Sequence, residues 1–198
     1  RNGTDLDDHY TIHNKVRYAL VRNQGAFSSL LSLVLGEPIV ATLSWDDFAH
    51  LGETLNCLEK FLYQAVKERM VGVNILVWGA PGTGKTELCK TLAANMGLKL
   101  YAVMEKDDND GEPTRRERLE CYQLSQNILS AQCDSLLMFD EMDDLFSGRE
   151  VAALFGKKPT LGSKVFINRL LENNPIPTIW LINDVTLLDQ SFIRRMSL

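Results

Sequence analysis

Eight consecutive residues have the types and the spacing of a loop that binds phosphate. They match the pattern GxxxxGK[ST] and read Gly79-Ala80-Pro81-Gly82-Thr83-Gly84-Lys85-Thr86. Glycines let such a loop curl until successive N–H groups point at phosphate oxygens, and the following helix adds its positive end. Lys85 is then expected to reach the β- and γ-phosphates of a nucleotide, and the Thr86 hydroxyl to bind Mg²⁺.

The alternative is a Gly/Pro turn that binds nothing. By average residue frequencies, about one chain in a hundred of this length matches the pattern by chance. The context favours the phosphate loop, because a strand is expected before it and a helix after it. We expect contacts with ATP or ADP from a short run of residues: Pro81, Gly82, Thr83, Gly84, Lys85, Thr86 and Glu87.

Two carboxylates follow an apolar segment further along the chain. Residues 136–139 are apolar and lead directly into Asp140 and Glu141. Ligands of a parallel sheet bind beyond the carboxyl ends of its strands, which places both carboxylates next to the phosphate loop. Asp140 is expected to complete the Mg²⁺ coordination and Glu141 to polarise the water that attacks the γ-phosphate. A solvated loop start is the alternative, and Asp143 and Asp144 are expected to be surface charges.

The elements that must position these residues alternate along the chain. Strands are expected over residues 73–78, 98–104, 135–139 and 178–182, with a short β-rich stretch over 39–43. Helical patterns cover residues 55–66, 86–96, 121–131 and 164–171, and Gly97 suits a left-handed helix end. Strands that are apolar on both faces and separated by helices indicate an α/β fold, a parallel sheet with helices on both faces.

Composition limits the remaining possibilities. The chain has 198 residues and a formal net charge of −5, which argues against general nucleic-acid binding. No apolar run reaches the roughly 20 residues that span a membrane, and no signal peptide is recognised, so a cytoplasmic protein is expected. The four cysteines form no CxxC pair and are expected to be buried, reduced thiols: Cys57, Cys89, Cys121 and Cys133.

Together these motifs resemble the AAA+ ATPases, and within them the AAA branch that includes spastin, katanin and Msp1-type proteins. Residues 43–48 resemble the segment whose backbone cradles adenine in that family, a place taken here by Asp47, Phe48 and Ala49. The phosphate loop and the acidic strand end correspond to its two Walker motifs. Asn183 matches the residue that positions the attacking water, and residues 188–196 resemble the segment that carries the arginine fingers.

The resemblance implies an ATPase that uses ATP and Mg²⁺, assembles as a homo-oligomeric ring, expected to be a hexamer, and remodels a protein partner. Arg194 and Arg195 are then expected to act on the nucleotide of a neighbouring subunit. Residues 43–198 would form the large ATPase subdomain, and residues 1–42 a helical lead-in or linker. Asn183 could instead be a turn former, and the two arginines could be solvated charges.

The sequence also departs from this family. Residues 104–112 are acidic and lack the aromatic residue of a threading pore loop, so they form either a solvated loop or a pore loop of different chemistry. The chain ends at Leu198, before the family's fifth strand and helical lid, which we interpret as a truncation or a record of ordered residues only. Residues 147–162 match nothing that we can assign. Two other functions remain open, a nucleotide-dependent switch with little turnover and a motor that works on nucleic acid.

Overall fold

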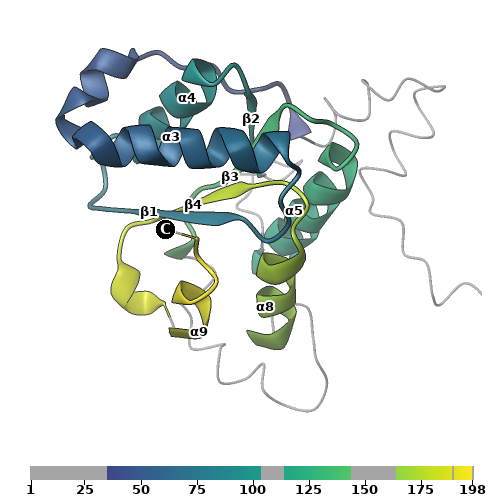
Figure 1. Cartoon of the computed structure of the whole chain (residues 1–198). Coiled ribbons are helices and arrows are strands. Elements are labelled where there is room, and N and C mark those ends of the chain that lie inside the picture. Colours follow the sequence, from purple (N-terminus) through teal and green to yellow (C-terminus); the bar gives the residue numbers. More distant parts are fainter. Residues whose placement is uncertain (1–34, 104–113, 144–163, 189, 198) are drawn as a thin grey trace, which may run out of the picture.

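The computed structural model describes residues 35–103, 114–143, 164–188 and 190–197 (Figure 1). The expected alternation of strands and helices is confirmed in these residues. The elements in chain order are η2 Trp45–Leu51, α3 Gly52–Lys67, β1 Asn74–Trp78, α4 Lys85–Asn95, β2 Lys99–Ala102, α5 Arg115–Leu129, β3 Ser135–Phe139, α8 Lys164–Asn173, β4 Thr178–Ile182, η3 Val185–Leu187 and α9 Gln190–Ile193.

The four strands form one parallel sheet in the order β1-β4-β3-β2. Ile75 of β1 lies opposite Ile179 of β4, and Phe139 of β3 lies opposite Trp180 of β4. All four strands run in one direction, so their carboxyl ends lie on the same side of the sheet. The segments that follow β1, β3 and β4 therefore meet there. The predicted phosphate loop, acidic pair and Asn183 each follow one of these strands.

Helices cover both faces of the sheet, as Figure 1 shows, with α3 and α4 on one side and α5, α8 and α9 on the other. Both central strands are fully buried, since successive residues point to opposite faces and both faces are covered. One core joins Leu136 and Ile179 to Leu62 of α3 and Leu92 of α4. The other joins Leu137, Phe139 and Trp180 to Leu119 and Tyr122 of α5 and to Leu171 of α8.

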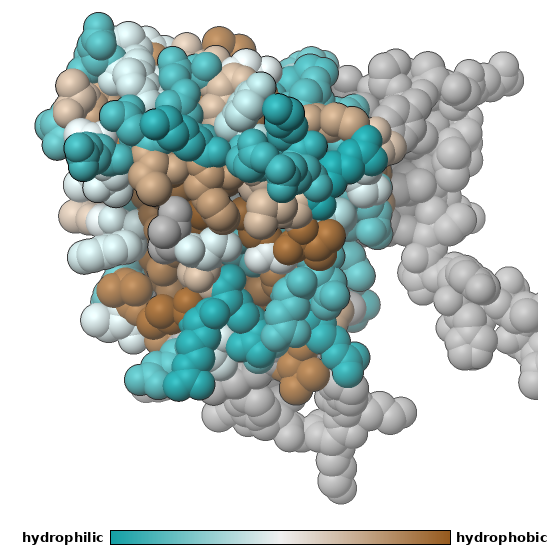
Figure 2. Space-filling model, viewed as in Figure 1, coloured by the Kyte–Doolittle hydropathy of each residue, from teal (hydrophilic) through white to brown (hydrophobic). Residues whose placement is uncertain are grey.

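Strand β1 lies at the edge of the described sheet, and apolar residues gather in a band over it in Figure 2, below the hydrophilic surface of α3. Trp78 at the end of β1 is 64% exposed and Val71 just before β1 is 61% exposed. At the start of β1 the backbone N–H of Ser197 donates to the carbonyl of Asn74, with an N···O distance of 2.6 Å. The segment after α9 therefore returns to the edge of the sheet.

Several predictions about local structure were wrong. Residues 39–43 form no strand, and Ile39 makes only an isolated antiparallel bridge with Leu100. Ala131 lies beyond the end of α5 and is exposed. Cys57 and Cys133 are exposed, whereas Cys89 and Cys121 are buried as expected. An exposed thiol at Cys57 follows from helix geometry, because the buried face of α3 is formed by residues 55, 62, 65 and 66.

Three predicted segments lie wholly or almost wholly outside the described residues: the lead-in helix over 10–35, the acidic stretch over 104–112 and the unassigned stretch over 147–162. Within the described residues, no helix has the length and apolar character needed to cross a bilayer.

Candidate nucleotide-binding site

The phosphate loop connects the end of β1 to the start of α4, as the motif predicts. Gly82 and Gly84 have φ angles of 77° and 85°, in the left-handed region that glycine enters without a steric penalty. The Thr83 hydroxyl donates to the Ala80 carbonyl at 2.8 Å, a hydrogen bond within the loop that stabilises its turn. The backbone conformation therefore favours glycine at positions 82 and 84.

Lys85 links the loop to the end of β4. Its Nζ donates to the carbonyl of Gly79 at 2.7 Å, to the carbonyl of Ala80 at 3.1 Å and to Oδ1 of Asn183 at 2.9 Å. The chain separates Lys85 from Asn183 by 98 residues. They come together because the strands that precede them, β1 and β4, are neighbours in the sheet. Two residues predicted independently from separate motifs are thus in direct contact.

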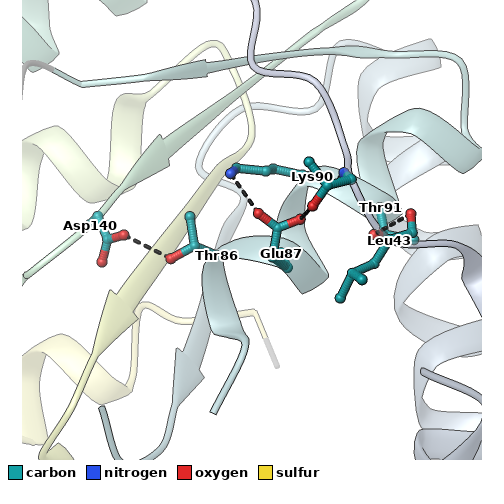
Figure 3. A network of polar contacts seen from close by, with 7 residues as sticks. Leu43, Thr86, Glu87, Lys90, Thr91 and Asp140 are labelled. Atoms are coloured by element: carbon teal, nitrogen blue, oxygen red, sulfur yellow. Dashed lines mark hydrogen bonds and ion pairs between the residues drawn. The ribbon is translucent and has the colours of Figure 1, made fainter. Parts of the chain in front are cut away.

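Thr86 and Asp140, the two predicted Mg²⁺ ligands, point toward one another from α4 and from the end of β3 (Figure 3). The Thr86 hydroxyl donates to Oδ2 of Asp140 at 3.0 Å. No group of three or more His, Cys, Asp or Glu residues with metal-site geometry occurs among the described residues. A hydroxyl and one carboxylate suit Mg²⁺, which commonly takes one or two protein ligands together with phosphate oxygens and water.

Glu141 follows directly and is exposed at the end of the sheet. Its φ of 52° is left-handed, which is uncommon for a residue with a side chain. Its backbone N–H donates to Oδ1 of Asp140 at 2.8 Å, so the first carboxylate holds the backbone of the second residue.

Asp143 is not the plain surface charge that the sequence suggested. Its carboxylate is half-buried and accepts from the backbone N–H of Asn183 at 2.9 Å and of Asp184 at 3.1 Å. This contact ties the segment after β3 to the segment after β4 and fixes the backbone of Asn183. Nothing in the local pattern distinguished Asp143 from its acidic neighbours, because its partners lie 40 residues away.

Arg118 of α5 was also missed by the sequence analysis. It is 5% exposed, and its guanidinium donates to the backbone carbonyl of Asp140 and, at 3.2 Å, to that of Glu141. The guanidinium carbon lies 4.5 Å from the centre of the Phe139 ring. A run of charged residues at the start of a helix normally indicates a solvated surface, which is why this arginine gave no signal.

The segment expected to cradle adenine forms the helix η2. Asp47 accepts from the backbone N–H and from the hydroxyl of Ser44, both at 2.8 Å, and these bonds lower the pKa of its carboxyl. Phe48 is buried in the core, whereas Ala49 is exposed. The side chains of Asp47 and Phe48 thus have structural contacts, and the adenine contact expected of their backbone stays a prediction.

Glu87 holds the preceding segment against α4. Its carboxylate accepts from Lys90 at 2.7 Å and from the Thr42 hydroxyl at 2.7 Å, contacts that lower its pKa in that order. Four residues on, the Thr91 hydroxyl donates to the carbonyl of Leu43 at 3.2 Å (Figure 3). The segment leading into η2 is therefore fastened to the helix that begins at the phosphate loop.

The two predicted arginine fingers differ from one another. Arg195 makes an ion pair with Glu172 of α8, with N···O distances of 2.7 Å from Nε and 2.6 Å from Nη2, and its Nη1 also donates to the carbonyl of Ser191. Arg194 is exposed, and we find no side-chain hydrogen bond or ion pair that joins it to another described residue. Arg195 is therefore held by its own chain, whereas Arg194 is exposed to solvent.

Comparison with known proteins agrees with this geometry. Residues 75–198 match the family model for the ATPase family associated with various cellular activities (AAA), and this chain belongs to that family. A solved structure titled "Structural Basis for Katanin Self-Assembly" superposes with a TM-score of 0.57 at 17% identity, covering 88% of this chain and 58% of that one. At this identity the likeness shows the fold.

Curated relatives share short parts of their length with this chain. A putative 26S proteasome regulatory subunit homolog of Methanothermobacter thermautotrophicus is 29% identical over 127 residues, which cover 62% of this chain and 33% of that protein. The katanin p60 ATPase-containing subunit A1 of Arabidopsis thaliana is 29% identical over 114 residues, covering 53% and 21%. The peroxisomal ATPase PEX6 of Candida glabrata is 28% identical over 100 residues, covering 46% and 10%. The matched part of this chain thus spans a third or less of each relative.

Proposed function

We propose that this chain binds ATP together with Mg²⁺ and hydrolyses it, as the nucleotide-binding core of an AAA ATPase. The observation that carries the proposal is the meeting of three strand ends. Lys85, in the loop after β1, contacts Asn183 after β4, and Thr86 contacts Asp140 after β3. These four residues come from three separate motifs, and each has the chemistry that its motif requires.

The roles follow from this arrangement. The backbone N–H groups of the loop and Lys85 would bind the phosphates, while Thr86 and Asp140 would hold Mg²⁺, which supplies charge neutralisation at the phosphates when bound. Glu141 would orient the attacking water and accept its proton, because its carboxylate is exposed beside the metal ligand. Asn183 would help to place that water.

At the level of the assembly, we propose a homo-oligomeric ring, a hexamer in the full-length protein, that remodels a protein partner. The support is family membership, together with relatives whose names describe a proteasome regulatory subunit homolog and a katanin subunit. Arg194 is the better placed of the two arginines to reach a neighbouring nucleotide, since Arg195 is paired with Glu172. The net charge of −5 disfavours nucleic acid as the partner, and a cytoplasmic location stays a prediction.

A switch that binds ATP with little turnover is the second candidate. The observation in its favour is the ion pair between Arg195 and Glu172, which engages one of the two expected fingers within its own subunit. Glu141 favours the enzyme, because a site that only binds nucleotide has no use for a catalytic carboxylate.

Nucleotide binding is tested by Lys85→Ala. The variant loses a charged phosphate contact worth about 1.5–3 kcal/mol, so the Kd for ATP should rise about ten- to hundredfold in a calorimetric titration. Lys67→Ala, an exposed lysine at the end of α3, is the control and should bind as the wild type does. Equal affinities for wild type and Lys85→Ala would refute the assignment of the loop.

A further inference from the structure

Arg118 occupies a position that its surroundings define closely. It lies in the first turn of α5, whose start is fixed by a capping box in which Glu117 accepts from the backbone N–H of Thr114 at 2.8 Å. Its side chain reaches the end of β3, where the guanidinium lies against the Phe139 ring. Its two terminal nitrogens reach the successive carbonyls of Asp140 and Glu141.

A buried guanidinium requires hydrogen bonds, because a charge removed from water without them is strongly disfavoured. Two of those bonds go to the backbone carbonyls of the expected metal ligand, Asp140, and of the expected base, Glu141. A guanidinium is suited to this task, since its planar fork presents several donors in fixed directions, whereas a lysine ammonium is a single point on a flexible stem. The contact between the guanidinium and the face of the Phe139 ring adds a cation–π attraction.

The same backbone has an uncommon conformation. Glu141 has a φ of 52°, and this left-handed residue is where the chain turns away from β3. Residues other than glycine adopt such a conformation where the surrounding structure holds it. Asp140 holds it through the N–H of Glu141, and Arg118 holds it through the two carbonyls. The direction in which the Glu141 side chain leaves the backbone depends on this turn.

We propose that Arg118 is a positioning residue for Glu141. By holding both carbonyls it fixes the left-handed turn and so aims the carboxylate at the water that attacks ATP. The inference rests on the proposed function, in which Glu141 is the catalytic carboxylate. Arg118 acts through the backbone and touches no reacting atom, so it differs from the arginines expected to reach the phosphates.

The test compares Arg118→Lys with Arg116→Lys in the full-length protein. Arg116 lies on the same helix but is exposed and paired with Glu120 on the surface, which makes it the matched control. We expect Arg118→Lys to lower kcat about ten- to hundredfold, the range in which small misplacements of catalytic groups fall. Its Kd for ATP should stay within about twofold of the wild type, because it leaves the phosphate loop intact. Arg116→Lys should leave kcat and Kd unchanged.

A double substitution distinguishes positioning from a general structural role. If Arg118 acts through Glu141, adding Arg118→Lys to Glu141→Gln should not lower the residual single-turnover rate further, since the group that it positions is already gone. A further loss equal to that seen in the wild-type background would overturn the proposal. The proposal would also be overturned if Arg118→Lys had a lower Tm but a kcat close to that of the wild type.

Two outcomes separate this proposal from the proposed function. If Glu141→Gln alone turns over ATP at the wild-type rate, Glu141 is not the catalytic carboxylate. The proposed role of Glu141 and the positioning role of Arg118 then both fail, whatever the Arg118 variants do. If Glu141→Gln is inactive and Arg118→Lys is fully active, only the role of Arg118 fails. Should the lysine variant not fold, Arg118→Gln, which buries no charge, carries the same comparison and is expected to show the same loss in kcat.

Discussion

Glu87 illustrates how single residues outside the motif chemistry shape this site. The motif places it next to Thr86, and we expected it to contact nucleotide. In the structure its carboxylate accepts from Lys90, which lies beside it in Figure 3. It also accepts from the Thr42 hydroxyl, and this bond fastens the segment before η2 to α4. That segment leads to the residues expected to surround adenine, so Glu87 connects the helix after the phosphate loop to the segment where the base is expected.

The lowered pKa of Glu87 gives a pH-dependent prediction. Its ordinary pKa is 4.5, and Lys90 and then Thr42 lower it in the folded state. A lowered folded pKa stabilises the protein above the ordinary value, and this contribution is lost as the pH falls through the folded pKa. Glu87→Gln should therefore be less stable than the wild type in urea at pH 7, and the difference should shrink below pH 4.5.

The control for this experiment is Glu53→Gln, which changes an exposed glutamate at the start of α3. It should stay close to the wild type at both pH values. A difference between wild type and Glu87→Gln that is constant across the acid range would contradict the assigned contacts.

The residues that sequence analysis found and those that it missed differ in a physical way. Lys85, Thr86 and Asp140 could be singled out because their expected roles depend on neighbours along the chain, which a motif records. Arg118 and Asp143 were missed because their partners lie 22 and 40 residues away. Their importance comes from bonds to backbone atoms, and those bonds leave no pattern in residue types.

At the scale of the elements, strands were easier to predict than the segments around them. Residues 135–139 and 178–182 were predicted with the observed bounds, since central strands buried on both faces are apolar throughout. Residues 39–43 looked equally β-rich but only approach β2 at Ile39. Strand pairing depends on a partner of suitable length and direction, which local composition does not supply.

Gly72, in the turn before β1, provides a prediction at this scale. It has a φ of 79°, and a Cβ at this position would lie 2.9 Å from the backbone oxygen of Glu172. Gly72→Ala should lower the free energy of unfolding, measured in urea. The left-handed backbone accounts for about 1–2 kcal/mol of the loss and the clash with Glu172 for about 1–3 kcal/mol.

Gly36 is the matched control for Gly72. It has a similar φ of 71°, but no atom lies within 4 Å of the place that its Cβ would take, so Gly36→Ala should show the strain alone. Equal losses in the two variants would mean that the turn before β1 does not pack against the end of α8 as described.

For the whole molecule, the central prediction about assembly concerns the arginines. We expect Arg194→Ala to abolish most turnover, because an arginine supplied across a subunit interface is worth about 10³–10⁵ in rate. Mixing Arg194→Ala with Glu141→Gln subunits should restore part of the activity. In a mixed ring some interfaces pair an intact Arg194 with an intact Glu141 of the neighbour.

Co-assembly of the two variants must be demonstrated by tagging one of them. A mixture that stays inactive despite co-assembly would favour a role for Arg194 within its own subunit. The parallel mixture with Arg195→Ala tests the pairing seen here, since Arg195 is held by Glu172 and should contribute mainly to stability.

The most direct test of the account is the comparison of binding and turnover in Glu141→Gln. The amide is nearly isosteric with the carboxylate and leaves Thr86 and Asp140 to hold Mg²⁺, but it cannot accept a proton from water. We predict that the variant binds ATP with an affinity within about twofold of the wild type and that phosphate release falls by about 10²-fold or more. Phosphate release at the wild-type rate, with ATP binding intact, would contradict the account.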